Sequence, residues 1–134
     1  MEQSAEQNLV FQLDLFTKAR KALDAALADD EGDVKSRNSL LLTYVFTFEM
    51  AVKSLRASLA VRGLNTPDYA AAVLKAALRA QLLDHPALWE QLKDHRNDVS
   101  HAYDEGKAIL IAAFVHEQAS ACFYRLALRL ERHD

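Results

Sequence analysis

Helical periodicity dominates this chain, and residues that interrupt helices are scarce. Apolar side chains recur every three or four positions through most of the sequence, which is the spacing of one α-helical face. Gly occurs three times and Pro twice in 134 residues, too few for a turn-rich β fold. The predicted helices cover residues 6–28, 36–62, 67–82, 86–102 and 107–132. We therefore expect an all-α bundle of four long helices and one short helix, and its short connections favour antiparallel neighbours.

The residues between the predicted helices indicate where each helix begins and ends. Gly63 is expected to terminate the second helix. Thr66 is expected to cap the third helix, with Pro67 at its first position. The run 29–33 is acidic and is expected to be a solvated loop. The last helix should bury one apolar face, formed by Leu110, Phe114, Ala121, Phe123, Leu126 and Leu130.

Composition and charge exclude several classes of protein. The formal net charge of −3 supplies no global basic surface for nucleic acid, so any RNA contact has to be local. Cys122 is the only cysteine, which excludes a disulfide framework, and we expect it to be buried. The N-terminus lacks the pattern of a signal peptide, and no apolar run is long enough to span a bilayer. We expect a cytoplasmic protein with one domain over residues 1–134.

Residues 95–105 concentrate reactive side chains in an otherwise plain amphipathic sequence. They include one arginine, one asparagine, two histidines, one tyrosine and three carboxylates. On a helical wheel Tyr103 leans toward the core and Arg96 lies at its edge, while Asn97 and His101 face away. Arg96 and His101 are about 140° apart on an ideal helix. They could converge only if the helix is distorted near its end, or if two subunits pair across it.

Less specific interpretations of these residues also remain open. Asn97 and His101 could form a structural pair at a dimer interface, and Tyr103 could be a half-buried core aromatic. In the second helix, Glu49, Lys53 and Arg56 recur at helical spacing. Spacing alone favours a surface ladder of ion pairs over a cleft shared with residues 95–105. His85, His116 and His133 lack zinc-ligand spacing and are expected on the surface or in loops, so we expect no metal and no cofactor.

The stretch Arg96-Asn97-Asp98-Val99-Ser100-His101, followed by Tyr103, resembles the hallmark of the HEPN superfamily. The resemblance is closest to the nucleotidyltransferase substrate-binding proteins, and it covers nearly the whole chain. Further matching features are Phe46-Thr47-Phe48-Glu49, Lys53, the proline-led third helix, Trp89, and His101-Ala102-Tyr103-Asp104-Glu105.

The resemblance implies an antiparallel up-and-down four-helix bundle with an additional short helix, usually as a homodimer. It also implies a partner, a minimal nucleotidyltransferase encoded beside it. This chain is not that transferase, because such enzymes need a Gly-Ser loop and paired aspartates on a strand. None of the three glycines here is followed by serine, and no strand is predicted.

The resemblance also implies roles for individual residues. His101 would be the general acid/base acting on a ribose 2′-hydroxyl, Arg96 would stabilise charge on the phosphate, and Asn97 would orient His101 or the phosphate. Tyr103 would be the residue that the partner adenylylates. Glu49, Lys53 and Asp104 would be candidates for lining the cleft. Two main functions follow: a substrate-binding or toxin component that binds nucleotide or RNA in a dimer cleft, or an active metal-independent ribonuclease toxin neutralised at Tyr103. An inactive helical assembly protein is a third.

Overall fold

The computed structural model describes residues 4–132, and within that range the chain is helical with no strand. The elements are α1 (Ala5–Asp29), α2 (Val34–Val61), α3 (Ala70–Arg79), α4 (Pro86–Asp98), the 3₁₀ turn η1 (Val99–His101), α5 (Glu105–Phe114), the π-helical turn η2 (Val115–Ala119) and α6 (Ser120–Glu131). α5, η2 and α6 follow one another without a break and make one long helix. The expected all-α fold is confirmed.

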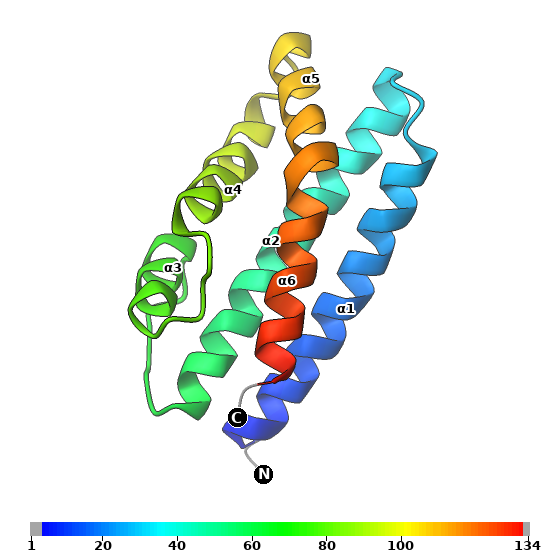
Figure 1. Ribbon diagram of the computed structural model, residues 1–134. Helices are drawn as coiled ribbons and strands as arrows, with labels where there is room; N and C mark the ends of the chain where they lie inside the picture. Colours follow the sequence, from blue (N-terminus) through cyan, green and yellow to red (C-terminus); the bar gives the residue numbers. More distant parts are fainter. Residues whose placement is uncertain (1–3, 133–134) are drawn as a thin grey trace.

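The long helices run alternately up and down (Figure 1). α1 and α2 are antiparallel, α4 runs back along the bundle, and the α5–η2–α6 helix returns to the end where α1 begins. The short α3 lies beside the lower part of α2, before α4. This is the expected four-helix bundle with an additional short helix. Its topology places the turn between η1 and α5 at one end and the α2–α3 connection at the other.

Local side-chain and backbone bonds account for the first helix boundaries. Ser4 and Gln7 form a reciprocal capping box at the start of α1, with bonds of 3.0 and 3.1 Å. Asp33 caps α2 by accepting a bond of 2.9 Å from the Ser36 amide. Gly63 follows α2 at φ +81°, as expected for a helix terminator.

Two expectations for the helices were wrong: where α3 begins, and which residues of the last helix are buried. α3 begins at Ala70 rather than Pro67, and Tyr69 occupies its N-cap without a side-chain bond. Thr66 and Pro67 belong to the preceding connection, where the Thr66 carbonyl accepts a bond from Arg56. In the last helix Leu110 and Ala121 are exposed. The run 108–115 is apolar throughout, so no polar residue marks which face is buried.

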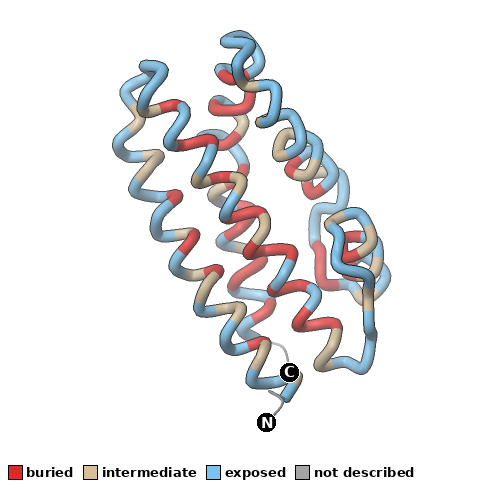
Figure 2. The backbone as a smooth tube through the Cα atoms, turned by 180° about the vertical axis from the view of Figure 1, so that it is seen from behind, coloured by how far each residue is buried: buried red, intermediate tan, exposed pale blue. Residues whose placement is uncertain are grey.

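The core is centred on an aromatic cluster that joins four helices. The ring of Phe123 in α6 lies 6.1 Å from Phe16 in α1, 6.1 Å from Tyr44 in α2 and 6.0 Å from Trp89 in α4. All four side chains are almost completely buried. Figure 2 shows buried segments on the inward sides of the helices, most densely along α2. Cys122 is buried beside this cluster as expected, and burial raises the pKa of its thiol to about 11.

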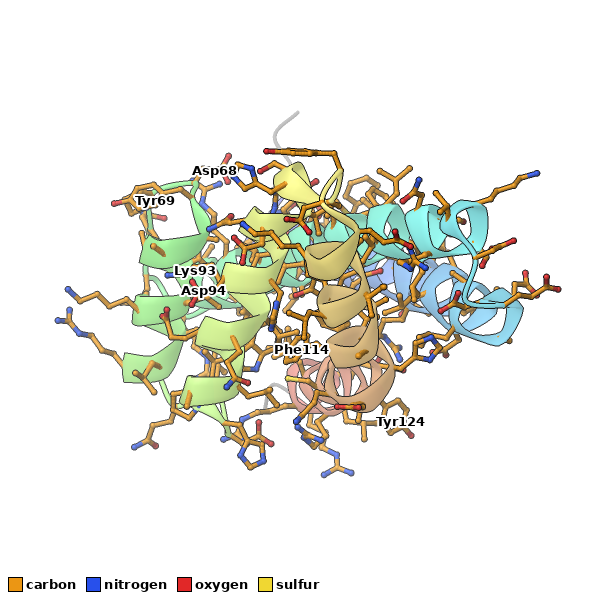
Figure 3. All side chains as sticks on the ribbon, turned by 90° about the horizontal axis from the view of Figure 1, so that it is seen from above. Asp68, Tyr69, Lys93, Asp94, Phe114 and Tyr124 are labelled. Atoms are coloured by element: carbon orange, nitrogen blue, oxygen red, sulfur yellow. The ribbon has the colours of Figure 1, made fainter. Side chains whose placement is uncertain are left out.

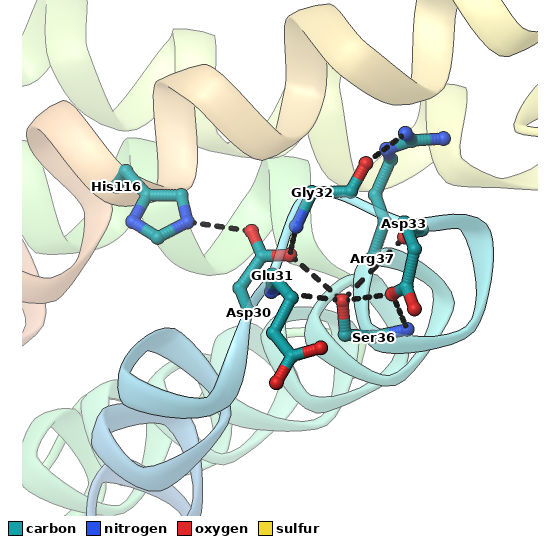
Figure 4. Close-up of polar contacts among 7 residues, drawn as sticks. All are labelled: Asp30, Glu31, Gly32, Asp33, Ser36, Arg37 and His116. Carbon is teal, nitrogen blue, oxygen red and sulfur yellow. Dashed lines mark hydrogen bonds and ion pairs between the residues drawn. The ribbon is translucent and has the colours of Figure 1, made fainter.

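The acidic loop between α1 and α2 is not simply solvated, contrary to expectation. The side chain of Asp30 is only 8% exposed, and its carboxylate lies 2.7 Å from the His116 Nε2 on η2 (Figure 4). The same carboxylate accepts bonds from the Gly32 amide (3.0 Å) and the Ser36 hydroxyl (3.1 Å). These bonds, led by that from His116, hold the pKa of Asp30 below its usual range. The loop is therefore tied to the last helix.

The structure of the described residues 4–132 also bears on metal clusters, membrane-spanning helices and the remaining histidines. Within residues 4–132, no cluster of three or more His, Cys, Asp or Glu side chains could hold a metal ion. None of the helices in this range is both long enough and apolar enough to cross a membrane. His85 is exposed at the start of α4, as expected for a loop residue. His133 lies outside the described residues.

Candidate functional site

α4 is fixed to the bundle just before the arginine of the motif. Trp89 and Leu92 are buried, and Pro86 occupies the first turn of the helix. The hydroxyl of Tyr44 in α2 donates a hydrogen bond of 2.5 Å to the Leu92 carbonyl. Burial raises the pKa of Tyr44, which keeps the phenol protonated as a donor. This contact holds α4 against α2 one turn before Arg96.

Arg96 is held at the edge of the bundle by α2. Its Nη2 lies 3.0 Å from the Glu49 Oε1, with the two side chains 33% and 45% exposed. Glu49 therefore pairs with α4 rather than within the expected ladder along α2. An ion pair this exposed contributes about 0.2–1 kcal/mol. Its main consequence is geometric, because the guanidinium is directed toward α2.

The end of α4 separates Arg96 from His101 further. The helix tightens into the 3₁₀ turn η1 before it ends. Counting about 120° per residue through this turn puts the two side chains roughly 180° apart around the axis, rather than 140°. His101 is exposed while Arg96 is half-buried. The distortion that the sequence suggested as a way to bring them together therefore has the opposite effect.

Tyr103 projects from the turn that follows η1. Its side chain is 88% exposed, so the expectation that it leans toward the core was wrong. The helical wheel does not apply there, because regular helix ends at Asp98. The ring centroids of His101 and Tyr103 are 6.2 Å apart in an edge-to-face arrangement. An imidazole and a phenol thus lie together at the tip of the bundle.

The remaining motif residues support this tip. Asp104 is the N-cap of α5, and its Oδ1 accepts a bond of 3.1 Å from the Lys107 amide. Asn97 is exposed, and its carbonyl accepts a bond of 2.9 Å from the Ser100 hydroxyl. Lys53 is exposed on α2, one turn beyond Glu49, and lines a hollow toward the opposite end of the bundle.

His95 packs between the two helices that flank the turn. Its ring centroid is 4.3 Å from that of Phe114 in α5, and Figure 3 shows Phe114 beside α4. Its Nδ1 is buried and has no hydrogen-bond partner among residues 4–132. From the sequence, the position of His95 next to Arg96 suggested only added local positive charge. Tyr44 was not expected to anchor α4, although a tyrosine in a buried stripe signals a hydroxyl that needs a partner.

The chain arranges these groups in two sets. On α4, Arg96 pairs with Glu49 of α2 and His95 packs on Phe114 of α5, whereas His101 with Tyr103 occupies the exposed tip. A base or nucleophile at the tip can meet a second macromolecule directly. With Arg96 directed toward Glu49 on α2 and His101 exposed at the tip, the two side chains face different directions within one chain.

Comparisons with known proteins agree with the motif. Residues 11–132 match the family described as nucleotidyltransferase substrate binding protein like. A curated protein of Haemophilus influenzae (strain ATCC 51907 / DSM 11121 / KW20 / Rd), named probable ribonuclease HepT, is 31% identical over 78 residues. That match covers 55% of this chain and 53% of the relative, so it spans about half of that protein's length. The chain belongs to the nucleotidyltransferase substrate-binding protein family, the HEPN-type family that its motif resembles.

Proposed function

We propose that this chain is the HEPN component of a two-protein module in the cytoplasm and that it docks a minimal nucleotidyltransferase through the tip carrying His101 and Tyr103. The observation that carries the proposal is the 88% exposure of the Tyr103 side chain. A large aromatic side chain this exposed gains little from folding, whereas it can fill a pocket on a partner. The family membership names the class of that partner.

The chemistry proposed at the tip is adenylyl transfer to the Tyr103 hydroxyl. The phenol oxygen attacks the α-phosphorus of ATP and the bond to the β-phosphate breaks. Pyrophosphate leaves, and the phenolic proton passes to a base of the transferase. The acceptor has to enter the active site of another protein, so it must project from a rigid segment of backbone. The cap that Asp104 forms at the start of α5 helps to hold this segment in place.

We further propose that two copies pair along α4. Arg96 and His101 face different directions in one chain, and Asn97 and His101 are both exposed. Pairing would allow Arg96 of one subunit and His101 of the other to border one cleft for a nucleotide or RNA. Sedimentation of the purified chain tests this step, because a monomer at micromolar concentration would remove the cleft.

Mass spectrometry after coexpression with the neighbouring nucleotidyltransferase tests the proposed chemistry. We expect one added AMP on Tyr103, and none in Tyr103→Phe. Tyr69→Phe is the matched control, because Tyr69 is also exposed (61%) but lies before α3. Modification that persists in Tyr103→Phe would show that the tip is not the acceptor. If the wild-type chain never gains AMP, the proposed modification is wrong and only the docking part of the proposal remains.

A metal-independent ribonuclease is the second candidate function. It is favoured by the exposure of His101, which can reach a 2′-hydroxyl, and by the name of the Haemophilus relative. We expect expression of the chain alone to slow growth and degrade RNA, with both effects lost in His101→Ala. His85→Ala is the matched control, since His85 is exposed outside the motif. Equal growth and intact RNA with and without His101 would exclude this activity.

A further inference from the structure

The polar hollow that Lys53 lines lies away from the motif, between α1, the C-terminal half of α2 and the α2–α3 connection. Its volume is about 430 Å³, within the range of small-molecule sites. The α2–α3 connection lies at the opposite end of the bundle from the turn that carries Tyr103 (Figure 1). The motif and the proposed docking function make no use of this hollow.

The sequence of α2 explains why space remains there. Lys53, Arg56, Ala57 and Ala60 follow one another at helical spacing and share one face of α2. The two alanines line the hollow with little side-chain volume, and the two cations line it with long side chains. Asn8 and Gln12, one turn apart on α1, supply amide groups on the other side.

The α2–α3 connection forms the third side of the hollow, and bonds within the chain hold it in place without a ligand. Gly63 turns the chain at φ +81°, and the Leu64 amide bonds back to the Leu59 carbonyl at 2.9 Å. Arg56 then donates from Nε to the Thr66 carbonyl at 2.9 Å. A guanidinium has further N–H donors beyond Nε, so Arg56 can hold the loop and still bind an anion. A preformed wall lowers the entropy cost of binding.

The charge at the hollow is opposite to that of the whole chain. Lys53 and Arg56 are accompanied there by one carboxylate, Asp68, although the chain carries a formal charge of −3. Glu49 would be the natural partner of Lys53 on α2, but it pairs with Arg96 instead. Lys53 consequently has no ion-pair partner within residues 4–132.

Two polar atoms in the wall also have unmet hydrogen-bonding capacity. The Gln12 Oε1 and the Thr66 Oγ1 are buried without a partner in the described part of the chain. An unsatisfied buried polar atom costs about 1–3 kcal/mol. The Gln12 Nε2 donates a long bond of 3.5 Å to the Asn8 Oδ1, so the Gln12 Oε1 is the free atom of this amide and can accept from a ligand hydroxyl after a small rotation. The wall thus offers acceptors for hydroxyls next to cations for an anion.

We propose that this hollow binds a small hydroxylated anion of the sugar-phosphate class. The phosphate lies against Lys53 and Arg56, which supply a point charge and a planar fork of donors. The sugar hydroxyls bond to Gln12 and Thr66. Ligand binding of this kind is independent of the tip, so the site would persist whether or not the transferase is the partner.

Calorimetric titration of the full chain tests the site with three probes: ribose 5-phosphate, inorganic phosphate and uncharged ribose. We expect saturable binding of ribose 5-phosphate, weaker binding of phosphate and none of ribose. Lys53→Gln should weaken ribose 5-phosphate binding roughly fivefold, corresponding to loss of one partly screened charge contact. Lys21→Gln, an exposed change on α1, should leave the affinity unchanged.

A second variant separates sugar recognition from general attraction of anions. Gln12→Leu should weaken ribose 5-phosphate binding and leave phosphate binding unchanged. No saturable binding of ribose 5-phosphate, or equal affinity in wild type and Lys53→Gln, would overturn the proposal. Tighter binding of a single-stranded RNA oligonucleotide through the same two residues would overturn it too, by showing a nucleic-acid surface. Circular dichroism of each variant confirms that it is folded.

Discussion

The hydrogen bond from Tyr44 to the Leu92 carbonyl is the contact that we expect to fix α4, and Tyr44→Phe removes it alone. The phenylalanine ring can keep the packing against Phe123, now 6.1 Å between ring centroids, so no cavity forms. Both the Tyr44 hydroxyl and its acceptor are buried and the bond is 2.5 Å long. A typical net contribution of a hydrogen bond is about 1 kcal/mol, and burial places this one at the upper end. We predict a loss of about 1–2 kcal/mol in the free energy of unfolding.

Urea titration followed by tryptophan fluorescence measures this loss directly. Trp89 is the only tryptophan and is buried in α4, so its signal reports the helix in question. Tyr69→Phe is the matched control, since it removes an exposed hydroxyl and should change stability by less than about 0.5 kcal/mol. If Tyr44→Phe were as stable as wild type, the bond would not anchor α4, and the account of how Arg96 is positioned would fail.

Three further perturbations test other parts of the fold. Phe123→Ala should lower the free energy of unfolding, measured by urea titration, by about 3–5 kcal/mol, because the ring joins four helices. A loss under about 1 kcal/mol would show that Phe123 is not central to the core. Glu49→Gln should cost less than about 1 kcal/mol, since the pair with Arg96 is partly exposed; a larger loss would make it a structural contact. Asp30→Asn should destabilise by about 1–2 kcal/mol at pH 7 by weakening the bonds that the carboxylate accepts. Because the Asp30 pKa is lowered in the folded state, this contribution is complete above the unfolded pKa near 4 and is lost as pH falls through the folded pKa. Equal stability of wild type and Asp30→Asn at pH 7 would show that the loop is not fastened there.

The fold followed from sequence wherever helical spacing and terminators agreed. α1 and α2 fall within two residues of the predicted bounds, and Gly63 ends α2 as predicted. The start of α3 did not follow, because Thr66-Pro67 also suits a loop. Arg56, distant in sequence, bonds the Thr66 carbonyl within that loop. Local propensity cannot anticipate such a long-range contact.

The position of the motif along the chain could be predicted from the sequence, but the arrangement of its side chains could not. The motif residues lie at the end of α4 as expected, and the sequence correctly placed Asn97 and His101 outside the core. The position of Tyr103 could not follow from a wheel, because it depends on where the helix ends. The pairing of Glu49 with Arg96 depends on packing between α2 and α4, which periodicity along one helix does not encode.

We propose that the exposed tip docks a nucleotidyltransferase, and titration of the purified chain with a purified minimal nucleotidyltransferase tests this docking directly. We predict a saturable complex that Tyr103→Ala weakens about tenfold or more, as for an aromatic residue at the centre of an interface. Tyr69→Ala, which removes an exposed tyrosine at the N-cap of α3, outside the tip, should leave the affinity unchanged. Absence of a complex, or equal affinity for wild type and Tyr103→Ala, would contradict the claim.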